Sequence, residues 1–303
     1  MISSVRQAEI VQCARNCVES SGFTSLPIDP KVIASAAGIG VMPWKPTKLG
    51  VSGFLMRAAN NQFGIGYSTA IGNNGFENFT IAHELGHYFL DGHPEAIFSS
   101  GSDRHYSRSG FVSDEKHEKE ADAFAAELLM PEQFFKAALR KSGAGFAGIQ
   151  HLAELGRTSL VATAIRFVKI TGDPVAVILS SGNEIDWCFV SKELGQCRGV
   201  YTLAKKSVLP PASGTAQFNR DRTKVERAEK FETSGSLRDW FERAPDVEFQ
   251  EDVVGLGHYG KTLTVLFTEE ALRDEDENED EEDDDAGSGM LSSRWQRNDR
   301  ERD

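Results

Sequence analysis

Hydrophobic residues occupy almost every direction around the predicted helix at residues 79–90, whose sequence is FTIAHELGHYFL. A helix that is hydrophobic all round is buried in the protein interior. This helix nevertheless carries two imidazoles on one face, because His83 and His87 are four residues apart. An unpaired buried polar group costs on the order of a few kcal/mol, so both rings need a partner.

The motif HELGH at residues 83–87 has the spacing that binds one zinc ion through two imidazoles. Glu84 is turned by about 100° from His83 around the helix, so it reaches a water molecule at the zinc instead of the metal. There it can act as the general base of hydrolysis. A tetrahedral catalytic zinc needs a third protein ligand and keeps its fourth position for water. The motif also recurs by chance in unrelated helices. A third ligand elsewhere in the chain would therefore support the interpretation as a zinc site.

A second amphipathic helix is predicted at residues 114–130. Its hydrophobic face is formed by Ala121, Phe124, Ala125, Leu128 and Leu129. With about 100° per residue, Glu118 and His117 flank this face one turn upstream, whereas Glu120 points away from it. Either Glu118 or His117 could complete a zinc site. Asp122, one turn after Glu118, could accept the second ring N–H of a zinc-bound histidine.

The chain before the histidine helix follows a helical pattern and then an alternating one. The expected elements are a helix at 5–20 and strands at 39–42, 50–56 and 62–67, which would form a small sheet. A helix starts at Pro30 with Asp29 as its N-cap. Residues 71–75 are expected to form a loop, and Asn78 or Thr80 to cap the histidine helix.

The segment between the two site helices is polar and rich in serine and glycine, so residues 95–113 are expected to form a flexible loop. His93, His105 and Tyr106 lie in or next to it. Each is a candidate for stabilising an oxyanion at the site, although the local composition favours exposed loop residues.

Residues 149–170 are predicted to form two short helices that are separated at Gly156, with Thr158 or Ser159 capping the second. The elements expected after them are a hairpin with strands at 175–179 and 185–190, a loop at 205–215, a helical piece at 236–243, and strands at 247–254 and 262–267. This α+β region contains no catalytic motif. The helix pair carries few basic residues, so packing or substrate docking is favoured over DNA binding.

Charge and composition add a further prediction mainly for the C-terminal residues. Residues 274–285 are eleven acidic residues and one asparagine, which account for most of the net charge of −13. A run of this kind is typical of a solvated, disordered tail, and it repels nucleic-acid phosphates. No stretch of 18 hydrophobic residues predicts a membrane helix, and no secretion signal is expected. Four sparse cysteines without a CxxC pair favour a reduced, cytoplasmic protein.

Together, FTIAHELGH at residues 79–87 and EKEADAFAAELLMP at 118–131 closely resemble the ImmA/IrrE family of metallopeptidases. The upstream pieces LPIDP at 26–30 and GVSGF at 50–54 are similar too, and the resemblance covers about residues 5–170. It implies that His83, His87 and Glu118 hold Zn²⁺ and that Glu84 is the catalytic base.

The resemblance also implies an architecture. We expect an α+β protein with a helical, zincin-like metallopeptidase core and a small antiparallel sheet at 1–142. A helix-turn-helix-like segment follows at 143–172, then a C-terminal α+β domain at 173–272 and an acidic, disordered tail at 273–303.

The predicted function is that of a cytoplasmic zinc endopeptidase. Members of the family typically cleave a helix-turn-helix repressor in stress responses or mobile elements, and others belong to toxin–antitoxin-like pairs. A specific repressor or antitoxin is therefore the expected partner, with DNA binding through 149–170 held as a lesser option. The alternative is a regulatory module that binds DNA or protein without cutting it and carries a structural zinc.

Overall fold

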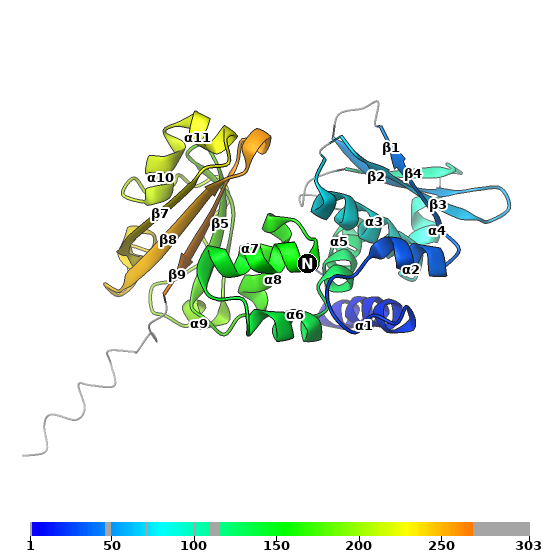
Figure 1. The fold of residues 1–303 in the computed structure, drawn as a ribbon, viewed down its shortest axis with the longest axis horizontal. Helices are drawn as coiled ribbons and strands as arrows, with labels where there is room; N and C mark the ends of the chain where they lie inside the picture. The colour runs from blue at the N-terminus through cyan, green and yellow to red at the C-terminus, as the bar shows by residue number, and fades with distance from the viewer. Residues whose placement is uncertain (1, 46–49, 71, 100, 109–114, 269–303) are drawn as a thin grey trace, which may run out of the picture. The chain divides into compact units, whose positions relative to one another are not determined.

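The computed structural model describes residues 2–45, 50–70, 72–99, 101–108 and 115–268, and it has the predicted α+β class (Figure 1). The helices are α1 Ser4–Ser20, α2 Pro30–Ala36, α3 Asn74–Phe89, α4 His93–Ile97, α5 Lys116–Leu129, α6 Glu132–Leu139, α7 Gly145–Gly156, α8 Leu160–Ile170, α9 Lys192–Gly195, α10 Gly214–Asn219 and α11 Arg222–Glu226, with short 3-10 helices η1 Leu237–Asp239 and η2 Gly257–Tyr259. The strands are β1 Gly40–Trp44, β2 Val51–Arg57, β3 Phe63–Ser68, β4 Arg104–Arg108, β5 Val175–Ser181, β6 Glu184–Val190, β7 Lys230–Ser236, β8 Glu248–Gly255 and β9 Thr262–Phe267.

The first sheet has the strand order β1-β3-β2-β4. β1 runs parallel to β3, and the other neighbours are antiparallel. Its first three strands lie where the alternating pattern predicted them. The sheet is therefore mostly antiparallel, as expected, with one parallel pair, and β2 and β3 lie against α3.

The predicted loop at 95–113 is wrong over two stretches, because α4 continues to Ile97 and β4 spans Arg104–Arg108. Successive side chains of a strand point to opposite faces of the sheet. In β4, His105 bonds to a residue of α5 and Ser107 is buried, whereas Tyr106 packs against aromatic rings on the other face. The inward positions of this strand are polar, so the hydrophobic alternation that marks a strand is missing from its sequence.

Helix α3 begins earlier than predicted. Asn73 is its N-cap, and its side-chain oxygen accepts a hydrogen bond from the Phe76 backbone at 3.0 Å. Asn78, a predicted cap, instead donates its amide to the Arg157 carbonyl at 3.1 Å. Thr80, the other predicted cap, is buried inside the helix. Because the helix begins at Asn74, a longer part of α3 lies between the first sheet and helix α5.

Helix α5 packs along α3, and α1 packs on α5 (Figure 1). Gly86 permits the close approach, because a Cβ there would lie 3.1 Å from the Ala121 Cα. Ala121, Phe124 and Leu128 are fully buried, which confirms the predicted hydrophobic face of this helix. The contact brings the first turns of α5 next to the histidine face of α3.

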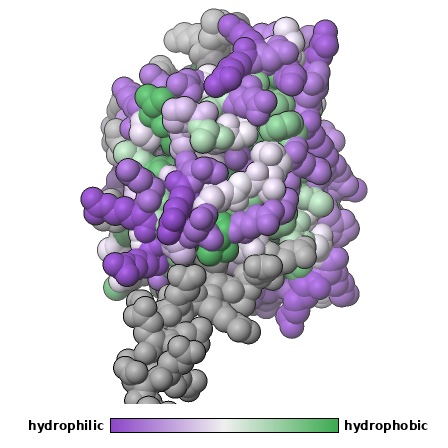
Figure 2. Space-filling model, turned by 90° about the vertical axis from the view of Figure 1, so that its left-hand side faces the viewer, coloured by the Kyte–Doolittle hydropathy of each residue, from purple (hydrophilic) through white to green (hydrophobic). Residues whose placement is uncertain are grey.

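The second sheet is antiparallel throughout, with the order β6-β5-β9-β8-β7. The predicted hairpin and the last two strands are confirmed, whereas β7 was not predicted. The predicted helical piece at 236–243 is only the single turn η1. The face on the left of Figure 1, where β7 and α10 lie, is mostly hydrophilic with small, separate hydrophobic groups (Figure 2).

The helix pair α7 and α8 forms as predicted, with Ser159 as the N-cap of α8. Helix α8 contacts β5 and β6, and α7 contacts β9. Arg166, a basic residue of α8, donates to the Met130 carbonyl and pairs with Glu127. Lys169 is the only residue of α8 that is exposed, and burial nevertheless lowers its pKa. A recognition helix needs an exposed face that enters the groove of DNA, and α8 lacks one.

The predicted domain boundaries after residues 142, 172 and 272 stay predictions. The acidic tail predicted at 273–303 lies outside the described residues. Within the described part of the chain, none of the helices is both long and apolar enough to cross a membrane.

Candidate functional site

Three predicted ligands converge between α3 and α5. The Nε2 atoms of His83 and His87 are 3.1 Å apart. The carboxylate of Glu118 lies 3.3 Å from the first of these nitrogens and 3.2 Å from the second. Among the described residues, this trio is the group of His, Cys, Asp or Glu side chains that could hold a metal ion.

The spacing between the donor atoms of these three residues fits a tetrahedral zinc ion. Zinc binds imidazole nitrogen and carboxylate oxygen at about 2.0–2.2 Å, so two ligand atoms of one tetrahedral ion lie roughly 3.4 Å apart. The observed separations of 3.1 to 3.3 Å are close to this value. The donor set of two imidazoles and one carboxylate also leaves a fourth position open, as in catalytic zinc sites.

Asp122 lies where the sequence predicted it. Its Oδ1 is 2.9 Å from Nδ1 of His83, so the ring donates from Nδ1 and directs Nε2 toward Glu118. Burial disfavours the charged form of His83, but hydrogen bonds to Asp122 and Glu118 outweigh it and raise its pKa to about 10. In the metal-free protein this ring therefore carries a proton in the place that a cation would take.

The other two ligands are also strongly perturbed. Burial lowers the pKa of His87 to about 3, so this imidazole is neutral. Burial would raise the pKa of Glu118, but hydrogen bonds from His105 and His83 hold it well below its usual range. A neutral imidazole beside a carboxylate that stays ionised is the protonation state that binds zinc.

Glu84 lies in the interior with no exposed surface, and neither carboxylate oxygen has a hydrogen-bond partner in the described structure. The buried hydroxyl of Ser107 in β4 is the polar neighbour of this carboxylate, although it is not in hydrogen-bond geometry. Burial raises the pKa of Glu84 to about 7, although the neighbouring charge of His83 opposes the rise. A buried carboxylate that titrates near neutral pH is suited to accept and return a proton.

Two of the three candidate oxyanion stabilisers, His105 and Tyr106, lie in β4 but have different positions. His105 Nε2 lies 3.0 Å from Glu118 Oε1, and its ring centre is 4.7 Å from that of His87. Tyr106 is 48% exposed and packs on the opposite face of β4. The structure therefore brings His105 to the site and turns Tyr106 away from it.

Two expectations about the surroundings of the site are wrong. His93, expected in an exposed loop, is fully buried, and Glu120, expected to point away from the buried face, is 1% exposed. Their side chains bond to each other at 3.0 Å behind His87. His117, the alternative third ligand, contacts the His93 ring and is not part of the metal-binding trio. The tight sequence Asp91-Gly92-His93-Pro94, with Gly92 at a φ of 81°, is a local signal that the chain turns back here.

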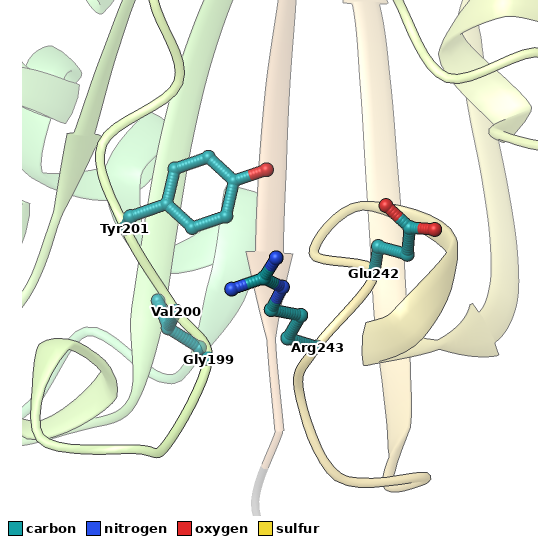
Figure 3. Close-up of a pocket in the computed structure, with 5 residues that line it drawn as sticks. All are labelled: Gly199, Val200, Tyr201, Glu242 and Arg243. Carbon is teal, nitrogen blue, oxygen red and sulfur yellow. The ribbon is translucent and has the colours of Figure 1, made fainter.

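The described residues contain a separate, open cavity of about 400 Å³ near the second sheet. Its lining residues are Gly199, Val200, Tyr201, Glu242 and Arg243 (Figure 3). In Figure 3 the Arg243 guanidinium lies between the Tyr201 ring and the Glu242 carboxylate. Its lining residues include neither a histidine nor a cysteine and none of the residues of the candidate metal site.

The comparisons with known proteins agree with this assignment. Residues 75–167 match the family model of the IrrE N-terminal-like domain, Peptidase_M78, which supports the predicted family resemblance over these residues. A similar fold occurs in a solved Mycobacterium tuberculosis transcriptional regulator, with a TM-score of 0.53, 15% sequence identity, and coverage of 86% of this chain and 76% of that chain. No curated protein matches the chain.

Proposed function

We propose that the protein is a zinc-dependent endopeptidase, because residues 75–167 match the IrrE N-terminal-like domain of a peptidase family. One observation carries the proposal: the two Nε2 atoms and the Glu118 carboxylate lie at zinc-ligand spacing beside the buried, unpaired carboxylate of Glu84. A purely structural zinc is usually closed by four protein ligands and needs no base beside it.

The residues of the site divide the work of hydrolysis. His83, His87 and Glu118 would hold the zinc, which when bound supplies a water of lowered pKa and polarises the scissile carbonyl. Glu84 accepts the proton of the attacking water and later delivers it to the leaving amine. His105, at the edge of the trio, keeps the proposed role of stabilising the oxyanion.

Strand β4 offers a way to bind an extended substrate. It pairs with β2 along one edge, and no other described strand pairs with its second edge. An extended peptide can add to such an edge through main-chain hydrogen bonds. Because His105 of β4 faces the site, a peptide on this edge would lie next to Glu84 and the metal ligands.

The proposed substrate is a helix-turn-helix repressor or antitoxin in the cytoplasm, as the family resemblance implies. The solved relative from Mycobacterium tuberculosis is described as a transcriptional regulator, and at 15% identity it supports the fold alone. DNA binding by residues 149–170 is disfavoured, because α8 is covered by its packing. A non-proteolytic binding module remains the alternative that the experiment below has to distinguish.

The test is a search for new protein N-termini after incubation of a host-cell lysate with the zinc-loaded protein. We expect a small set of cuts that depends on zinc and includes a helix-turn-helix protein. The matched control is the Glu84→Gln variant, which should bind the same partner and leave it uncut. A partner that is bound by both proteins and cut by neither would overturn the proposal and favour the binding module.

Gly53 of β2 gives a second test of the position of the base. A Cβ there would lie 2.5 Å from Thr80 Cγ2, 2.9 Å from the Gly66 carbonyl and 3.1 Å from Glu84 Oε1. We expect Gly53→Ala to cost about 1–3 kcal/mol in unfolding free energy, a typical cost of overpacking, and to lower cleavage by displacing Glu84. The control is Gly40→Ala in β1, where nothing lies within 4 Å of the added Cβ. Equal changes of stability and cleavage in both variants would mean that the added methyl group at Gly53 does not act through Glu84.

A further inference from the structure

A continuous line of polar contacts runs from the surface helix α1 to the back of His87. Arg6 Nε donates to Glu120 Oε2 at 2.9 Å. The same oxygen lies 3.0 Å from His93 Nε2, and His93 Nδ1 lies 3.2 Å from His87 Nδ1. His87 and His93 are fully buried, and Glu120 is 1% exposed, so water does not compete for these contacts.

The ionised carboxylate of Glu120 determines which ring nitrogens of His93 and His87 carry protons. Glu120 Oε2 is an acceptor, so a neutral His93 must carry its proton on Nε2 to donate to it. Its Nδ1 is then a bare lone pair, which can only accept. His87 must therefore carry its proton on Nδ1, which leaves its Nε2 lone pair free for the metal, at the position where the Nε2 of His83 lies 3.1 Å away.

We propose that His93 is a positioning residue for the metal, which together with Glu120 and Arg6 sets the tautomer and orientation of His87. A metal-binding histidine commonly donates its second N–H straight to a carboxylate or carbonyl. His83 follows that arrangement with Asp122. For His87, the line of contacts inserts a second imidazole between the ligand and the carboxylate.

Arg6 has two roles in this arrangement. Besides its bond to Glu120, it donates from Nη2 to the backbone carbonyl of Asp91 at 3.1 Å. Asp91 lies two residues before His93 in the chain. It thereby joins α1 to the turn that carries His93 and to the carboxylate that orients it. These contacts explain why Glu120 of α5 and His93 of α4 are buried together, although both lie in polar stretches of the sequence.

The inference rests on the proposed metal site, and the test separates the two. Zinc affinity is measured by competition with a chelator for the wild type, His93→Leu and His117→Leu. His117 is the control because its ring contacts His93 and lies outside the line of hydrogen bonds. We expect His93→Leu to weaken zinc binding by about 10–100-fold, the usual effect of an outer partner, and His117→Leu to leave it unchanged.

A second readout does not depend on metal. Long-range ¹H–¹⁵N spectra of histidine-labelled, metal-free protein report which ring nitrogen of His87 carries the proton. We expect Nδ1–H in the wild type and in His117→Leu, and a mixture of tautomers in His93→Leu. A wild type without zinc affinity would contradict the proposed function, while the tautomer would still test this inference.

Two outcomes would overturn the inference: a folded His93→Leu protein with unchanged zinc affinity, or one with an unchanged His87 tautomer. If His93→Leu does not fold, the nearly isosteric Glu120→Gln variant decides the question. It removes the charge that holds the His93 proton on Nε2, and we expect it to weaken zinc binding by roughly tenfold. Wild-type affinity in folded Glu120→Gln would then reject the inference.

Discussion

We expect the Glu84→Gln variant to keep its zinc and to lose cleavage by about 10²–10⁴-fold in kcat/KM, the usual contribution of a general base. The amide has nearly the shape of the carboxylate but cannot accept the proton of the attacking water. The metal ligands are untouched, because Glu84 has no hydrogen bond to any of them in the described structure. Single-turnover cleavage and zinc content, measured on one preparation, test both halves of the prediction.

The same substitution should raise stability in the metal-free protein at neutral pH. Burial raises the pKa of Glu84 from 4.5 to about 7, so between these values the folded state holds a proton that the unfolded state has lost. This carboxylate therefore lowers the unfolding free energy progressively as pH rises from 4.5 to 7, by about 3 kcal/mol in total. Glutamine does not titrate, so the stability difference between variant and wild type should grow across that window.

Opposite changes in activity and stability distinguish a catalytic carboxylate from general damage to the fold. Glu77→Gln is the matched control, since Glu77 lies in the first turn of the same helix, away from the ligands. It should leave both quantities unchanged. Wild-type cleavage by Glu84→Gln would exclude Glu84 as the base, whatever the stability data show.

The sequence was sufficient for the placement of His83 and His87 because helical spacing is local. The spacing of four residues from His83 to His87 places the rings on one face, and the helical wheel placed Glu118 beside the buried face of α5. The wheel could not decide between Glu118 and His117, since both flank that face. The structure distinguishes them through the packing of α5 on α3, a contact between segments about thirty residues apart.

The parts that sequence reasoning missed depend on distant partners. Glu120 is buried because Arg6, 114 residues away in the chain, supplies a charge for it. His93 is buried because Glu120 and His87 take up both of its nitrogens. β4 escaped prediction because its inward side chains belong to the site and are polar. Hydrophobic patterning finds the core of this protein, and it fails where polar groups are buried together for chemistry.

The second large effect is expected from Glu118→Ala, which removes the one anionic ligand of the trio. Zinc affinity should fall by more than roughly 100-fold, because a direct bond to the metal is lost. Loss of a residue that only hydrogen-bonds to a metal ligand usually costs up to about 100-fold. Cleavage should disappear with the metal and should not return at moderate excess zinc. Metal content after dialysis, chelator competition and cleavage measure the effect, with Glu154→Ala on the exposed face of α7 as the control.

A comparison of Glu118→Ala with Glu118→Gln separates the ligand role from hydrogen bonding. Glutamine keeps an oxygen that can accept from His105, whose Nε2 lies 3.0 Å from Glu118 Oε1. It lacks the negative charge of the carboxylate, and a neutral amide binds zinc poorly. We therefore expect the metal to be lost in both variants. Zinc retained in Glu118→Gln but lost in Glu118→Ala would mean that the side chain mainly supports His105. Zinc retained in both would contradict the assigned ligand set and transfer the third position to His105, the nearest remaining imidazole beside His87.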